Sequence, residues 1–146
     1  MRDLTPVLAV FLAGLVFFAL ELHLALVFTF AAGSAAVVFL GVIVVAQLVL
    51  LAAYLAVGFL PPSLLRFAPL VLAGAGAVTA ISLGPAPASD LPAAFLRTAP
   101  LLLIALAAGM ILPAALRRGS TSQTVFPLLT VSNAGAALGL LASGLV

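Results

Sequence analysis

The chain has 146 residues, of which 66% are hydrophobic and only 5% are charged. A soluble domain carries about 25% charged residues, so this chain lacks the polar side chains that a water-exposed surface requires. The absence of cysteine, the single histidine and the five scattered arginines give no reason to expect a metal site built by this chain alone or a nucleic-acid partner.

Apolar runs longer than the roughly 18 residues that mark a spanning helix follow one another along the chain. We therefore predict an all-α fold, a polytopic membrane helix bundle that forms a single transmembrane domain over 1–146. A Gly-Ser pair at 33–34, a Pro-Pro pair at 61–62, and polar or Pro-rich loops at 84–90 and 117–123 separate the runs. They divide the bundle into about five transmembrane helices, at 4–32, 35–60, 64–83, 91–116 and 125–146.

The arginines indicate how the bundle is oriented. Cytoplasmic loops carry an excess of Lys and Arg, and five spans place the two termini on opposite sides of the membrane. With the N-terminus in the cytoplasm, four of the five arginines are cytoplasmic, namely Arg2, Arg66, Arg117 and Arg118, and Arg97 is outside. The composition lacks lysine and is typical of a high-GC genome, so we expect a multi-pass protein of a bacterial cytoplasmic membrane.

Small residues recur at four-residue spacing on the last helix. Gly135, Gly139 and Ser143 lie on one face, with Asn133 close by. Lipid is as apolar as leucine, so membrane helices associate where small residues let their backbones approach closely. We expect this face to pack inside the bundle or against a partner. Four polar residues are expected to be buried and to form interhelical hydrogen bonds: Gln47, Tyr54, Thr79 and Asn133.

Glu21 and His23 lie well inside the first helix, at a depth where ionisable groups are costly. They are two residues apart and therefore point to nearly opposite sides of the helix. Glu21 is either a protonated or hydrogen-bonded residue of the bundle, or a proton carrier. His23 is either a neutral imidazole bonded to a carbonyl or lying near the outer interface, or a group that binds a haem or pigment, relays a proton or contacts a quinone. The cofactor stays unknown, and we predict no catalytic residue because no catalytic motif is present.

Two segments resemble the membrane part of proteins that are fused to spermidine-synthase-like domains. Residues 125–142 contain a Ser-Asn-x-Gly segment similar to the helix that closes the membrane part in that family. Residues 20–22 and 30–38 are similar to the family's first helix, where a Leu-Glu pair precedes a Gly-Ser turn. The order of five helices, with a Pro-rich loop before the fourth, also fits this family.

The resemblance implies a membrane module without the family's catalytic part. Aminopropyl transfer belongs to a soluble domain that would follow where this chain ends, so no catalytic residue carries over. Glu21 and Asn133 map onto membrane residues of the family. Ala25 and Leu26 depart from it, because the family usually has an arginine a few residues after the glutamate.

Three functions follow from these observations. The first is a non-catalytic integral membrane module or subunit that anchors or scaffolds partner proteins, or presents a lipophilic substrate to a separate soluble subunit. The second is an accessory subunit of a respiratory or photosynthetic membrane complex, with His23 contacting a haem, pigment or quinone. The third is a small oligomeric transporter or channel with Glu21 as its coupling group. All three imply contact with the lipid bilayer, and the first two imply other membrane or soluble subunits as partners.

Overall fold

A computed structural model describes residues 4–33, 35–83, 91–118 and 122–143. These residues form six helices and no strand, which confirms the all-α prediction. The helices are α1 (Thr5–Ala32), α2 (Ala35–Phe59), α3 (Pro62–Leu65), α4 (Ala68–Leu83), α5 (Leu91–Arg118) and α6 (Ser122–Ser143).

Three helices are long and apolar enough to cross a membrane. Their candidate spans are Thr5–Ala32, Ala36–Phe59 and Leu91–Arg118. Two shorter apolar helices accompany them, at Ala68–Leu83 and Val125–Gly139. The described part of the chain therefore identifies a multi-pass membrane protein with three candidate spans, and the fourth and fifth spans stay predictions.

The expected helix at 64–83 is divided into α3 and α4 in the structure. The reason is Pro69, which has no backbone N–H to donate to the carbonyl of Leu65. A turn follows instead, in which the N–H of Phe67 donates to Leu64 O at 3.0 Å. At 16 residues, α4 is about 24 Å long, which is shorter than the roughly 30 Å hydrocarbon core of a bilayer.

Two other expected boundaries also differ. The helix expected at 91–116 continues to Arg118, which places two cations in its last turn, where they stabilise the helix dipole. The last helix begins at Ser122 rather than at residue 125, and residues 144–146 lie outside the described part.

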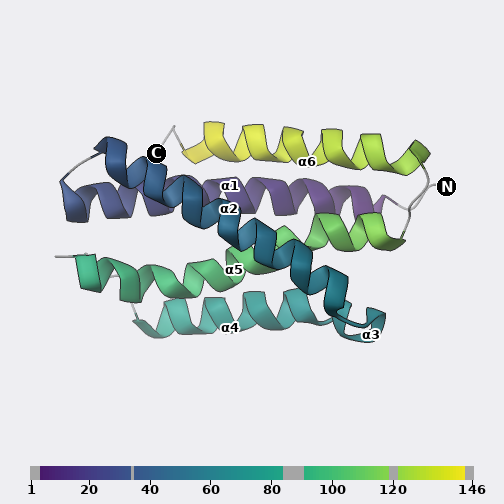
Figure 1. Ribbon diagram of the computed structural model, residues 1–146, viewed down its shortest axis with the longest axis horizontal. Helices are drawn as coiled ribbons and strands as arrows, with labels where there is room; N and C mark the ends of the chain where they lie inside the picture. Colours follow the sequence, from purple (N-terminus) through teal and green to yellow (C-terminus); the bar gives the residue numbers. More distant parts are fainter. Residues whose placement is uncertain (1–3, 34, 84–90, 119–121, 144–146) are drawn as a thin grey trace.

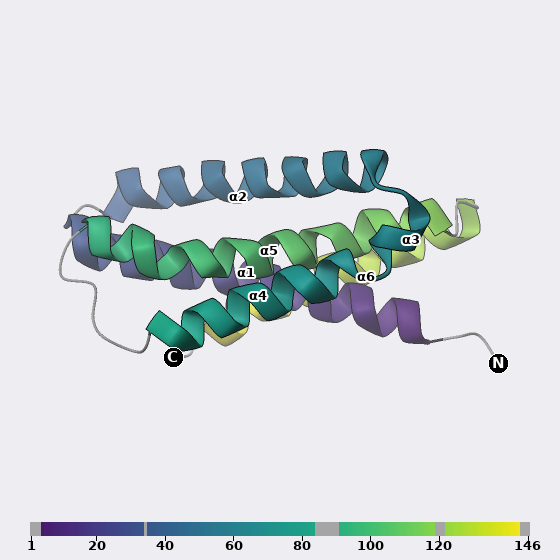
Figure 2. The same ribbon diagram turned by 90° about the horizontal axis from the view of Figure 1, so that it is seen from below.

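The long helices run along the longest axis of the molecule (Figure 1). Helices α1 and α5 pack against each other at the centre, α6 packs mainly against α1, and α4 packs mainly against α5. Helix α2 crosses over α1 and α5 and forms a layer of its own (Figures 1 and 2). Among the described residues, this arrangement leaves one side of α2 without a neighbouring helix.

The core lies where α1, α2 and α5 meet. One buried cluster joins Phe17 of α1 to Ala46 of α2 and to Ala105 and Ala108 of α5. A second cluster joins α2, α3 and α5 around Met110, which is fully buried. Many leucine, valine and phenylalanine side chains outside these clusters are exposed, as expected for a surface whose solvent is lipid.

One arginine ties two helix ends together. Arg117 Nη1 donates to the carbonyl of Val57 at 2.5 Å and to that of Leu60 at 2.8 Å. The last carbonyls of a helix have no partner within the helix, and the helix dipole favours a cation beside them. Arg117 therefore caps the C-terminal end of α2 from the last turn of α5. Helix α3 lies at the same end of the bundle (Figure 1).

Candidate functional site

The glycines of α6 lie directly against the backbone of α1. A Cβ atom on Gly135 would overlap the carbonyl oxygen of Phe11, and one on Gly139 would overlap that of Leu15. The contact is reciprocal, because a Cβ atom on Gly14 would lie 2.5 Å from the carbonyl oxygen of Ser132. These three glycines therefore form a backbone-to-backbone seam between the two helices.

Of the other residues singled out on α6, Asn133 lies away from this seam, and the prediction for Ser143 falls outside the described side chains. Asn133 is exposed on a different side of the helix from Gly135. Ser143 is the last residue of α6, and its side chain lies outside the described part.

The expectation that four polar residues are buried is wrong, because Gln47, Tyr54, Thr79 and Asn133 are all exposed. The physical reason is that α2, α4 and α6 each pack on one side only, and these side chains lie on the other side. The hydroxyl of Thr79 donates to Ala75 O at 2.8 Å, within its own helix.

Glu21 lies at the junction of α1, α2 and α5. Its side chain is half-buried, and its Oε2 atom is buried without a hydrogen-bond partner among the described residues. A small cavity of about 10 Å³ adjoins this side chain. The other lining residues are all apolar: Phe17, Leu24, Ala46, Val49, Leu102 and Ala105.

His23 is exposed and does not share this cavity. The structure thus keeps the two ionisable residues of α1 apart, as their two-residue spacing predicts. Within the described residues, no three His, Cys, Asp or Glu side chains gather where they could hold a metal ion.

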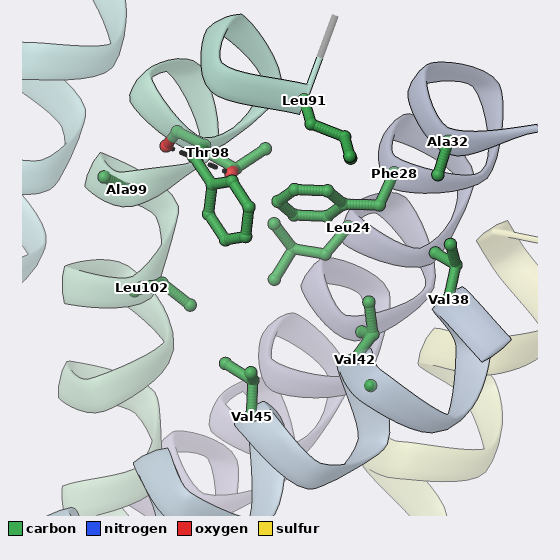
Figure 3. A pocket seen from close by; sticks show the side chains of 12 residues that line it. Leu24, Phe28, Ala32, Val38, Val42, Val45, Leu91, Thr98, Ala99 and Leu102 are labelled. Carbon is green, nitrogen blue, oxygen red and sulfur yellow. Dashed lines mark hydrogen bonds between the residues drawn. The ribbon is translucent and has the colours of Figure 1, made fainter.

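A much larger apolar groove of about 390 Å³ opens between the C-terminal half of α1 and the N-terminal halves of α2 and α5. Figure 3 shows Phe28 of α1, Val45 of α2 and Leu102 of α5 around this space. The remaining lining residues are Leu24, Ala32, Val38, Gly41, Val42, Leu91, Phe95, Thr98 and Ala99. Its volume is within the range of roughly 300–1,000 Å³ that is usual for ligand pockets.

Thr98 carries the one side-chain hydroxyl on the wall of this groove. It donates to Ala94 O of its own helix at 2.7 Å, and Phe95 O lies 3.4 Å from the same hydroxyl (Figure 3). The rings of Phe28 and Phe95 meet on the wall with centroids 4.8 Å apart. The described residues that line the groove therefore offer hydrocarbon contact and no free polar side chain.

Sequence reasoning did not find this groove. Nothing in the apolar pattern distinguishes a helix face that lines a groove from one that faces lipid. Gly41 gave no signal for it either, because a small residue inside an apolar membrane helix indicates a close approach of another helix. The structure shows open space around Gly41 instead, with no atom within 4 Å of where its Cβ would be.

The exposed side of α2 carries polar groups that have no partner in the described structure. Val44, Gln47, Leu51, Tyr54 and Gly58 follow one another at alternating three- and four-residue spacing and are all exposed. This spacing places them on one side of the helix, which we call the α2 outer face. The side chains of Gln47 and Tyr54 make no hydrogen bond with any described residue.

The fold and these sites define the class of the protein as a multi-pass membrane helix bundle. Comparison of the chain with family models, with curated proteins and with solved structures finds no match. The resemblance to the membrane part of spermidine-synthase-like fusions accordingly stays a prediction.

Proposed function

We propose that this chain is a non-catalytic membrane module that scaffolds an assembly, and that the α2 outer face is its contact with another protein chain. The observation that carries the proposal is Gln47, a polar side chain exposed in the middle of a candidate span. We propose that this partner is a second copy of the chain, which contributes its own α2 outer face.

The depth of Gln47 makes exposure to lipid costly. It lies midway between Ala36 and Phe59, which bound the span. Hydrocarbon offers no hydrogen bond to its amide, and an unsatisfied polar group there costs free energy. Tyr54 lies only about 8 Å along the helix from Phe59, where its hydroxyl can reach the membrane interface. Gln47 has no such route to water, so a protein partner is its best source of hydrogen bonds.

A second copy fits this face because a side-chain amide is self-complementary. The amide of Gln47 carries both a donor and an acceptor, so two copies related by a two-fold axis can exchange hydrogen bonds. Gly58 lies on the same face, and no atom approaches within 4 Å of where its Cβ would be. Its missing side chain allows a partner backbone to come close.

The topology that we propose has five spans, with α4 and α6 as the two short ones and the N-terminus in the cytoplasm. The contacts of Arg117 with Val57 and Leu60 support this orientation. They bring Arg117 and Arg118 to the end of the bundle where α3 lies and Arg66 follows it (Figure 1). Three arginines at one end fit an excess of positive charge on the cytoplasmic side.

Cysteine cross-linking in native membranes tests the proposed contact. The chain has no cysteine, so each introduced thiol is the only one. We expect Leu51→Cys, which is 55% exposed on the α2 outer face, to give an oxidised product of twice the chain mass. The matched control is Leu70→Cys on α4, 71% exposed, which should stay monomeric.

Adding Gln47→Leu to Leu51→Cys should strongly reduce the dimer, because it removes the interhelical amide bonds. Equal cross-linking from both cysteine positions would mean random collision and would contradict the proposal. A product with a mass other than twice that of the chain would show that a different subunit, and not a second copy, contacts the α2 outer face.

A further inference from the structure

The apolar groove and the Glu21 cavity are neighbours. Leu24 and Leu102 line both of them, so these two side chains form the partition between the spaces. The groove lies on the opposite flank of α2 from Gln47, since it is lined by Val38, Val42 and Val45. A ligand in the groove is therefore independent of the contact proposed for the α2 outer face.

The two spaces differ in what they offer a ligand. The groove contributes hydrocarbon surface, because the hydroxyl of Thr98 is already bonded to Ala94 O. The small cavity contributes one free polar atom, Glu21 Oε2, which is buried and has no partner in the described structure. A ligand that used both would need an apolar body and a hydrogen-bonding end.

Size limits that end to a very small group. A space of about 10 Å³ is about what one water-sized group needs, so a phosphate or an aromatic ring does not fit there. A hydroxyl does fit. An ammonium group of similar size would bring a charge into surroundings that are otherwise apolar, which is costly at this depth.

From this juxtaposition we infer that α1, α2 and α5 bind a long-chain alcohol from the bilayer. Its hydrocarbon chain lies in the groove, and its hydroxyl passes between Leu24 and Leu102 and donates to Glu21 Oε2. The chain alone gives no selectivity, because lipid tails are as apolar as the groove. Selectivity comes from the hydroxyl, and one such hydrogen bond changes the affinity roughly two- to tenfold.

Photolabelling in vesicles of phosphatidylcholine tests the inference with two matched probes. One probe is a hexadecyl alcohol that carries a diazirine on its chain, and the other is its methyl ether, which cannot donate a hydrogen bond. We expect the alcohol to label the segments of α1 and α5 that line the groove roughly two- to tenfold more than the ether does. Glu21→Leu should remove this preference and leave both probes at the level of the ether.

Two glycine variants test whether the chain lies in the groove. Gly41 lines the groove and Gly74 lies on α4, and both have open space where a Cβ would be. Gly41→Leu should fill the groove and reduce labelling by both probes, whereas Gly74→Leu should leave it unchanged.

Equal labelling by alcohol and ether in the unmodified chain would overturn the inference, because donation from the hydroxyl to Glu21 would then contribute nothing to binding. Unchanged labelling of Gly41→Leu would overturn the placement in the groove. The probe comparison uses the natural sequence, so it stands even if a variant fails to fold.

Discussion

Helix α1 packs against α6 and against α2 in two different ways. Against α6 the backbones meet at Gly14, Gly135 and Gly139, and no side chain separates them. Against α2 and α5 the contact runs through side chains, and it leaves both the Glu21 cavity and the groove of about 390 Å³. Composition is apolar in both places, so the position of the small residues decides whether a membrane helix pair closes or leaves room.

The largest effect is expected where the backbones meet. Gly135→Ala places a methyl group on the carbonyl oxygen of Phe11, and backbone atoms cannot move aside as a flexible side chain can. We expect it to lower the free energy of unfolding in mixed micelles by about 3 kcal/mol. Gly74→Ala is the matched control, because nothing lies within 4 Å of its Cβ position. The control should be neutral or stabilising, since alanine favours a helix by about 1 kcal/mol over glycine.

An equal effect of the two alanines would show that α1 and α6 have room to separate. The α1–α6 seam would then be no tighter than the contact of α1 with α2, and the proposed difference between the two contacts would be wrong.

The next effect concerns how α2 is held at its end. Arg117→Met removes the two hydrogen bonds to Val57 O and Leu60 O. Hydrogen bonds from a charged group are worth about 1.5–3 kcal/mol when buried, and Arg117 is exposed, so we expect a loss of about 1–2 kcal/mol. The measurement is thermal unfolding together with hydrogen exchange of the last turn of α2.

Arg118→Met is the control for this prediction. Arg118 is the neighbouring arginine, and it has no partner among the described residues. If it weakens α2 as much as Arg117→Met does, the effect is one of net charge and not of the two carbonyl contacts.

Much of this arrangement could be predicted from the sequence. Apolar runs and their glycine and proline breaks located the helices, because hydrocarbon requires every backbone group to be bonded within a helix. The four-residue spacing of Gly135 and Gly139 indicated a contact face before its partner was known. What the spacing could not indicate was that this partner is α1, since Gly14 does not belong to a repeated small-residue pattern.

The polar residues could not be placed from the sequence. In a soluble protein a polar residue among apolar ones marks the exposed side of a helix, whereas in lipid both sides are apolar. Gln47 was therefore expected inside the bundle, yet it lies on the outer face of α2. Glu21 was identified from the cost of a carboxyl group at its depth, but the groove beside it depends on how α2 crosses α1 and α5.

A smaller effect is expected from a glycine-to-alanine substitution where α5 packs against α2. A Cβ on Gly109 of α5 would lie 3.1 Å from Ala53 Cβ and 3.3 Å from Leu50 Cδ2, both of which belong to side chains. Leu50 can rotate and α2 can shift, so Gly109→Ala should cost roughly 1 kcal/mol or less. A loss as large as that of Gly135→Ala, measured in the same micelles, would show that α2 is packed as tightly as α6.

The smallest effect is expected at Thr98. It tests whether a side chain of the groove itself forms a hydrogen bond with the ligand. Threonine and valine have nearly the same shape, so Thr98→Val removes the hydroxyl and leaves the volume of the groove unchanged. That hydroxyl bonds to Ala94 O, a carbonyl that already takes part in its own helix. We expect a change of about 0.5 kcal/mol in the free energy of unfolding and no change in alcohol labelling. Loss of labelling in this variant would mean that the Thr98 hydroxyl leaves Ala94 O and bonds to the ligand. The hydroxyl of the alcohol would then be recognised in the groove and not at Glu21.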